Sequence, residues 1–184
     1  MQLNKRIIVV LILTIIFGLL KTKQIYNQRS FFKNINQNQV NTIRFPAKVT
    51  KVMDGDTIEI EFLDKKPIEF KNKEIVRLIG IDCPELNLYK HKEPDFYAKE
   101  AYLFTKKELT NQYVELQLDN ISQDKDKYGR VLGYIWVETH LFNQILVERG
   151  FAKYYPNFRF NSDKMELFSK AEQYSKINYL GMWE

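Results

Sequence analysis

Residues 47–62, AKVTKVMDGDTIEIEF, decide the fold of this chain. Polar and apolar side chains alternate over residues 47–52 and again over residues 57–62, which is the pattern of strands with one buried face. Asp54 and Gly55 lie between the two runs, and Asp-Gly is the commonest sequence of a tight hairpin turn. We therefore predict an antiparallel β-hairpin that opens the folded part of the chain.

Three further strands are predicted beyond the hairpin. Residues 75–81 and 131–137 form mostly apolar runs, and residues 114–118 alternate between polar and apolar. The predicted number of strands is therefore about five, in two groups along the chain.

Helices are predicted between and after these strands. Apolar residues recur at helical spacing over residues 96–109, starting with Phe96, and a shorter helix is expected over residues 141–148. A last helix runs to about Lys176, with Ser162 or Asp163 as its N-cap. The combination favours an α+β fold dominated by a small twisted barrel with about three helices, compatible with an oligonucleotide-binding (OB) fold.

Composition limits the class of protein. A chain of 184 residues can form one domain with a proper core and a tail, and 45% hydrophobic and 14% aromatic residues exclude wholesale disorder. The net charge of +5 favours an anionic partner, although many proteins with so small a surplus bind none. The single cysteine, Cys83, excludes an intrachain disulfide, and neither His91 nor His140 is placed to make it a nucleophile.

The N-terminus has the pattern of an export signal. An apolar run of about fourteen residues, Ile7–Leu20, follows Lys5 and Arg6 and precedes further lysines. This length is short for a membrane span, and no small-x-small cleavage motif follows it. Residues 1–21 are therefore interpreted as a signal peptide or an uncleaved signal anchor, and we expect the rest to be exported, either secreted or membrane-anchored outside the cytoplasm.

Two regions follow this segment. Residues 22–44 are rich in Asn and Gln and are expected to form a polar linker. Residues 45–184 are expected to form the folded domain, which we expect to be a monomer. If residues 1–21 are not cleaved, the membrane itself is a partner.

Five charged residues in three short segments have the chemistry of one site. Carboxylates bind hard divalent cations and activate water, and arginines bind a phosphate bidentately. Each segment alone has an ordinary explanation, as a hairpin turn, a connector or a solvated loop. Together they indicate a metal-dependent phosphodiesterase site formed by Asp56, Arg77, Asp82, Glu85 and Arg130.

Aromatic residues could extend this site toward a nucleotide. Tyr128 lies two residues before Arg130, and an aromatic face beside a guanidinium suits a base stacked next to its phosphate. Tyr154 and Tyr155 are further candidates, although aromatics near a C-terminal helix are more often part of the core.

In this order, the segments resemble those of the thermonuclease, or staphylococcal nuclease-like, family. The matching motifs are Asp-Gly-Asp-Thr at 54–57, Arg-x-x-x-x-Asp-x-Pro-Glu at 77–85 and Asp-Lys-Tyr-Gly-Arg at 126–130. The resemblance runs from about Phe45 to Trp183. It implies a five-stranded OB-fold barrel with three helices, and a Ca²⁺-dependent endonuclease, a hydrolase of ester bonds, that cleaves DNA and RNA and leaves 3′-phosphate ends.

The resemblance also assigns roles by position. Asp56 and Asp82 would bind Ca²⁺ together with the backbone carbonyl of Cys83, a position at which the best-known member has threonine. Glu85 would act as general base or orient the attacking water. For the scissile phosphate the implied residues are Arg77 and Arg130, and for the nucleotide they are Lys127 and Tyr128.

Two alternatives stay open. A catalytically inactive nucleic-acid-binding domain can be built on the same barrel, although such domains usually lose the acids that this chain keeps. A structural or adhesive surface protein is supported by the N-terminal segment alone.

Overall fold

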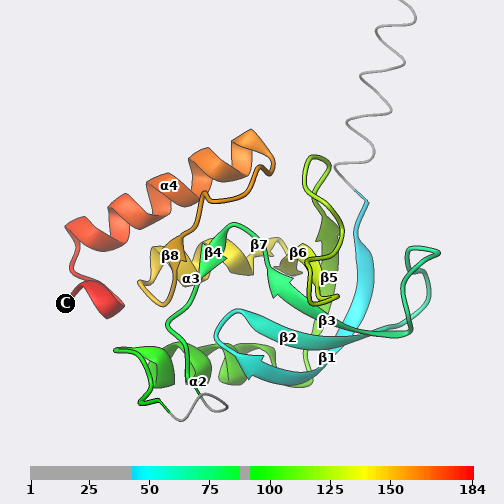
Figure 1. Cartoon of the computed structure of the whole chain (residues 1–184), viewed down its shortest axis with the longest axis horizontal. Helices are drawn as coiled ribbons and strands as arrows, with labels where there is room; N and C mark the ends of the chain where they lie inside the picture. Colours follow the sequence, from blue (N-terminus) through cyan, green and yellow to red (C-terminus); the bar gives the residue numbers. More distant parts are fainter. Residues whose placement is uncertain (1–42, 88–91) are drawn as a thin grey trace, which may run out of the picture. The chain divides into compact units, whose positions relative to one another are not determined.

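The alternating residues 47–62 form the predicted antiparallel hairpin. In the computed structural model, which describes residues 43–87 and 92–184, β1 (Phe45–Asp54) pairs with β2 (Thr57–Phe62), and Asp54 lies opposite Thr57 (Figure 1). The alternation buries one face of each strand against the core, as expected. The buried residues of this hairpin are Ala47, Val49, Val52, Ile58, Ile60 and Phe62.

The five longer strands close into a barrel. β2 pairs with β3 (Lys73–Leu78), β1 pairs with β5 (Tyr113–Leu118), and β5 pairs with β6 (Val131–Val137), all antiparallel. A parallel pairing between β3 and β6 closes the ring, and the two-residue strand β7 (His140–Leu141) extends it beyond β6. The predicted five-stranded barrel is confirmed.

The strand predicted over residues 75–81 is divided in two. β3 ends at Leu78, and Ile81–Asp82 form a separate strand, β4, which pairs with β8 (Lys153–Tyr154). Gly80 makes the turn between them with φ +78°, and a Cβ at this position would lie 2.7 Å from the ring of Phe160. The apolar run was predicted as one strand because pattern alone does not reveal a turn inside a buried segment.

The first described helix begins two residues later than predicted. α2 spans Ala98–Leu109 and packs against β1 (Figure 1). Tyr97 is in the left-handed region, with φ +67°, so the helix cannot extend back to Phe96. Phe96 is 74% exposed and is not one of the core positions that its helical spacing suggested.

Of the two remaining helices, one packs directly on the barrel and the other packs on the first. α3 (Phe142–Glu148) packs on β6, and α4 (Ser162–Ile177) packs on α3, followed by the short 3-10 helix η1 (Gly181–Trp183). The N-cap of α4 is Asn161, whose side chain accepts hydrogen bonds from the backbone of Asp163 and Lys164. The predicted cap at Ser162 or Asp163 was therefore wrong by one or two residues.

Asp119 anchors the loop that leads into β6. Its Oδ1 accepts hydrogen bonds from the backbone N–H groups of Ile121 and Ser122, each 2.8 Å long. Its Oδ2 accepts from the hydroxyl of Tyr134 and from the backbone N–H of Asn161, which begins α4. One buried carboxylate thus ties the start of the loop to both β6 and α4.

The predicted signal segment, residues 1–21, and nearly all of the predicted linker, 22–44, lie outside the described residues. Among the helices that the structure describes, none has the length and apolar character needed to cross a membrane.

Asn143 joins the turn after β3 to the barrel. It is fully buried, its Oδ1 accepts from the backbone N–H of Ile135 at 3.0 Å, and its Nδ2 donates to the carbonyl of Ile79 at 3.0 Å. Nδ2 also lies 3.4 Å from the carbonyl of Gly133. This amide therefore fixes the approach to Gly80 and β4.

We predict that Asn143→Ala lowers the free energy of unfolding by about 3 kcal/mol, because it leaves buried backbone groups without partners. Urea unfolding followed by circular dichroism measures the change. Asn178→Ala, which removes a hydrogen bond on the exposed end of α4, is the matched control and should cost no more than about 0.5 kcal/mol. Equal stability losses in the two variants would contradict this role for Asn143.

Candidate active site

Two turns at one end of the barrel bring most of the predicted site residues together. The β1–β2 turn carries Asp54 and Asp56, and the segment from β3 through the Gly80 turn carries Arg77 and then Asp82. The two turns meet because β2 and β3 are paired, with Thr57 opposite Arg77.

Arg77 is the centre of this cluster. Its Nη1 lies 2.8 Å from Asp56 Oδ2, and its Nη2 lies 2.7 Å from Asp82 Oδ1. Nη1 also donates to the backbone carbonyls of Leu78 and Ile81. The Arg77 side chain is only 14% exposed, so one guanidinium holds two carboxylates and the turn between β3 and β4 in place.

Asp56 is tied to the second turn as well. Its Oδ2 accepts a 2.8 Å hydrogen bond from the backbone N–H of Cys83, and its Oδ1 accepts from the hydroxyl of Thr57. The Cys83 thiol is buried, and burial raises its pKa well above the usual value. A thiol that stays protonated is inert, which agrees with the sequence-based exclusion of a cysteine nucleophile.

The carboxylates of the cluster repel one another. The pKa of Asp56 is raised to about 6, mainly by burial and against the opposing effect of Arg77, and the charges of Asp54 and Asp82 contribute to the rise. Burial likewise raises the pKa values of Asp54 and Asp82, and in both the negative charge of Glu85 adds to the shift. The cluster therefore carries more negative charge than Arg77 neutralises.

This donor set fits a hard divalent cation. The side-chain donors are carboxylate oxygens, which calcium prefers together with backbone carbonyls and water, and added positive charge would relieve the repulsion. Within residues 43–87 and 92–184, however, no three Asp, Glu, His or Cys side chains stand ready as a preformed metal centre. Asp56 and Asp82 each give one oxygen to Arg77, so a cation would share these two residues with the guanidinium.

Asp95 holds the backbone of Glu85 and was missed in the sequence. Its Oδ2 accepts from the Glu85 N–H at 3.1 Å, and its own N–H donates to the Glu85 carbonyl at 3.0 Å. Its Oδ1 accepts from the side chain of Asn87 at 3.2 Å. Nothing in the polar stretch before α2 distinguishes Asp95 from its neighbours, so only the fold reveals this contact.

Arg130 belongs to a separate group on the loop before β6. Its Nε lies 2.8 Å from Asp126 Oδ2, and Asp126 Oδ1 accepts from the backbone N–H groups of Tyr128 and Arg130. The ring of Tyr128 is 72% exposed, with Lys127 Nζ 5.0 Å and Arg130 Cζ 5.5 Å from its centroid. Lys127, Tyr128 and Arg130, three of the residues predicted to bind phosphate or nucleotide, thus lie together.

The carboxylates around Arg77, namely Asp54, Asp56, Asp82 and Glu85, are called the acid cluster below. The parallel pairing of β3 with β6 places the Arg130 loop near this cluster. Val131 lies opposite Val76, and Leu132 lies opposite Arg77, so Arg130 immediately precedes the strand beside Arg77. In the described residues, the ion pair of Arg130 is with Asp126 rather than with the acid cluster.

The segment around β8 borders the acid cluster on another side. Lys153 lies opposite Asp82, and Tyr154 lies opposite Ile81. Both Tyr154 and Tyr155 are half-buried, and the backbone N–H of Tyr155 donates to the carbonyl of Gly80. The structure therefore places both tyrosines at the β4 edge, and it adds Lys153, which sequence reasoning missed.

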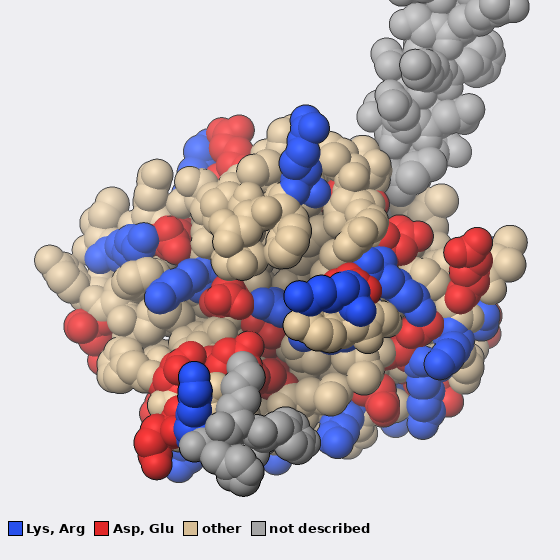
Figure 2. Space-filling model, in the orientation of Figure 1, with Lys and Arg blue, Asp and Glu red and all other residues tan. Residues whose placement is uncertain are grey.

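Charged side chains of both signs lie close together on the face of the molecule that Figure 2 shows. Figure 2 shows acidic and basic side chains close together over its middle, rather than in separate patches. The binding of a polyanion to this face would therefore depend on a few individual Lys and Arg side chains rather than on a broad basic surface.

Comparison with known proteins accounts for this arrangement. Residues 75–184 match the family described as staphylococcal nuclease homologue. The thermonuclease of Staphylococcus hyicus is 33% identical over 177 residues, which cover 95% of this chain and 97% of that protein. The chain belongs to the staphylococcal nuclease family.

Other relatives of the staphylococcal nuclease family match a smaller part of the chain. The thermonuclease of Staphylococcus intermedius is 40% identical over 138 residues, or 74% of each protein. The SPbeta prophage-derived endonuclease YokF of Bacillus subtilis is 28% identical over 137 residues, which cover 72% of this chain and 42% of that protein. The resemblance inferred from the three motifs is confirmed.

We predict that Arg77→Met destabilises the fold, because it leaves the buried Asp56 without its guanidinium. The free energy of unfolding in chelator should fall by about 3–5 kcal/mol, the usual cost of removing one partner of a buried ion pair. Arg130→Met, whose ion pair lies on a surface loop, is the control and should cost about 1 kcal/mol or less.

The double variant Asp56→Asn/Arg77→Met should recover a large part of this loss, since it removes the uncompensated charge as well. A double variant no more stable than Arg77→Met would show that the guanidinium acts through its backbone hydrogen bonds alone.

Proposed function

We propose that the Arg77 cluster is the active site of a Ca²⁺-dependent nuclease that hydrolyses DNA and RNA and leaves 3′-phosphate ends. That the protein is a nuclease, a hydrolase of phosphodiester bonds, follows from its family and from the two thermonucleases it matches. The observation that carries the proposal is the pairing of Arg77 with two carboxylates in a cluster that retains excess negative charge.

Asp56 and Asp82 are the side chains that would hold the cation, together with the backbone carbonyl of Cys83. When bound, a cation at these oxygens supplies positive charge for the phosphoryl oxygens and polarises the attacking water. Asp56 is held by Cys83 and Thr57, so its carboxylate is oriented before any ligand arrives.

Arg77 and Arg130 are proposed to bind the scissile phosphate. A phosphodiester gains negative charge in its pentacoordinate transition state, and guanidiniums fixed in advance stabilise that charge at little reorganisation cost. Arg77 is fixed by four contacts to the protein, and Arg130 by Asp126. The loss of one such donor typically costs about 3–4 kcal/mol of transition-state stabilisation.

Glu85 is proposed to take the proton of the attacking water or to orient that water. It lies three residues after β4 and, like Asp82, it lines a surface hollow of about 300 Å³. Asp95 holds the backbone N–H and the carbonyl of Glu85 by hydrogen bonds. A carboxylate held in this way can stay within reach of the phosphate while its side chain adjusts to the substrate.

We predict that the full chain digests single-stranded DNA and RNA when CaCl₂ is added and stops when a chelator exceeds the metal. Gel electrophoresis follows the digestion, and end-labelling after phosphatase treatment identifies the 3′-phosphate. Activity that persists in chelator would contradict the metal requirement. Binding to DNA without cleavage at any calcium concentration would instead favour a non-catalytic binding domain.

We predict that Glu85→Gln lowers kcat about 100- to 1,000-fold, because the neutral amide cannot accept the proton of the water. Initial rates on a fluorescent oligonucleotide measure the loss. Glu69→Gln, on the exposed connection between β2 and β3, is the matched control and should leave kcat unchanged. A rate for Glu85→Gln within a few-fold of the unmodified protein would remove Glu85 from the chemistry.

A further inference from the structure

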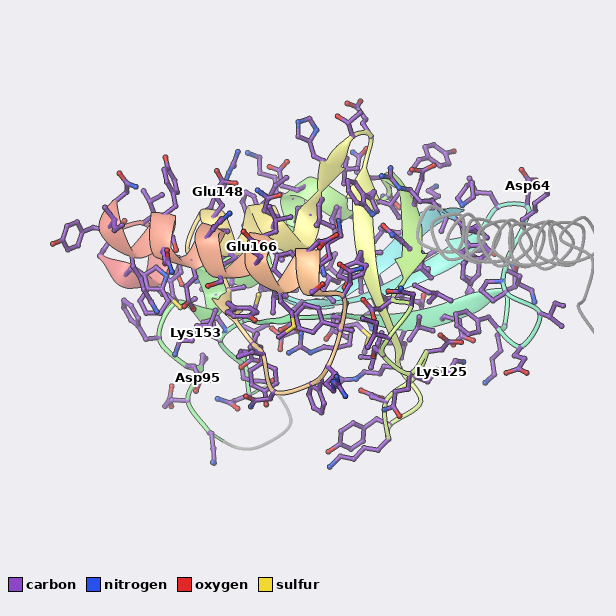
Figure 3. All side chains as sticks on the ribbon, turned by 90° about the horizontal axis from the view of Figure 1, so that it is seen from above. Asp64, Asp95, Lys125, Glu148, Lys153 and Glu166 are labelled. Carbon is purple, nitrogen blue, oxygen red and sulfur yellow. The ribbon has the colours of Figure 1, made fainter. Side chains whose placement is uncertain are left out.

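A hollow of about 300 Å³ extends from the acid cluster toward the C-terminus. Its lining includes Asp82 and Glu85 of the acid cluster together with Asp95, Phe96, Lys153 and Trp183. Figure 3 shows Asp95 and Lys153 on the same side of the molecule, away from Lys125 in the loop before β6. The hollow thus lies apart from the loop before β6, and its volume is at the lower end of the range for ligand pockets.

Lys153 provides a cation at the edge of this hollow. It lies directly opposite Asp82 in the β4–β8 pair, and its positive charge acts to lower the pKa of Asp82 against the larger effect of burial. Its Nζ lies 5.9 Å from the centre of the Trp183 ring. None of the ion pairs found within 4.0 Å among the described residues includes Lys153, so its ammonium group can approach a ligand in the hollow.

Phe96 provides an exposed aromatic face at the same hollow. Its ring centroid is 5.8 Å from that of Tyr97, and the Tyr97 ring centroid is 5.8 Å from that of Phe151. The preceding residue, Asp95, is fixed by its hydrogen bonds to Glu85. A single exposed phenylalanine is ordinary in itself, but this one lines the same hollow as a cation and a proposed catalytic carboxylate.

We propose that this hollow is a second nucleotide subsite, in which Phe96 stacks on a base and Lys153 binds the phosphate that follows. The proposal rests on the proposed function: it assigns the nucleotide on the opposite side of the scissile phosphate from the one that contacts Tyr128. Proteins usually bind single-stranded nucleic acid with aromatic side chains that stack on the bases and nearby cations that contact the phosphates. A base in the hollow must be unstacked, so the subsite selects single-stranded substrate.

The carboxylates in the walls determine where each part of the nucleotide lies. Asp95 and Glu85 would repel a phosphate, which therefore lies at Lys153, and the uncharged base lies against Phe96. The Asp95 carboxylate already accepts two hydrogen bonds, from the Glu85 N–H and from the Asn87 side chain, and acts as a support for the wall.

A cycle of protein and substrate changes tests the contact between Phe96 and a base. The intact substrate is a single-stranded oligonucleotide with one cleavable phosphodiester among phosphorothioates. Two further substrates carry an abasic residue, one on the 5′ side and the other on the 3′ side of that phosphodiester. Phe96→Ala should lower kcat/KM about tenfold on the intact substrate. On one of the two abasic substrates it should have less than about a twofold effect, because the base that it contacts is already missing.

Lys153→Gln tests the phosphate contact through its salt dependence. The slope of log(kcat/KM) against log[salt] should become shallower by about 0.7, the value for one phosphate contact on a single strand. The matched control is Tyr113→Ala with Lys48→Gln, an exposed aromatic and a lysine 6.0 Å from its ring, on β5 and β1. These two substitutions should change neither kcat/KM on the three substrates nor the slope of log(kcat/KM) against log[salt].

Two results would overturn the subsite. One is an unchanged kcat/KM for Phe96→Ala on the intact substrate, and the other is an equal loss on all three substrates, which would indicate a structural effect. If the unmodified protein cleaves none of them, the proposed function fails, and the same cycle is then measured as oligonucleotide affinity by fluorescence anisotropy. Affinities that do not depend on Phe96 and the base together would reject the subsite in that case as well.

Discussion

The ion pair between Arg77 and Asp56 is the interaction on which the rest of the site depends. A buried carboxylate is costly unless a cation and hydrogen-bond donors satisfy it, and Asp56 obtains both, from Arg77 and from the backbone of Cys83. Because these partners come from β3 and from the segment after β4, Asp56 can be satisfied only when the barrel is formed. This buried ion pair of the site is therefore also a contact that defines the fold.

The barrel explains why these particular side chains meet. Antiparallel pairing of β2 with β3 places the hairpin turn beside Arg77, and parallel closure of β3 on β6 brings the Arg130 loop to the neighbouring strand. Gly80 then reverses the chain within two residues, so that Asp82 returns to the guanidinium that precedes it by five positions. Each of these relations is a matter of register, and a shift by one residue would point Arg77 into the core.

Sequence reasoning found the strands and the charged residues but not the features that depend on tertiary contacts. Alternation over residues 47–62 predicted the hairpin because one face of it is buried, and the three motifs predicted the cluster around Arg77. The turn at Gly80 was hidden inside an apolar run, and Phe96 had helical spacing without being in a helix. Asp95 and Lys153 have no pattern of their own, since they matter only through the residues opposite them, Glu85 and Asp82.

The excess of negative charge around Arg77 has a consequence for how the site would respond to its ligands. One guanidinium is shared by Asp56 and Asp82, and repulsion among the neighbouring carboxylates is the cause of part of the raised pKa values in the cluster. A divalent cation would lower that energy, and it would also weaken the hold of the aspartates on Arg77, because they would share their charge between two partners. The Arg77 guanidinium would then be more available to a phosphate. Cation and phosphate should therefore bind cooperatively, through the charge balance of a single buried cluster.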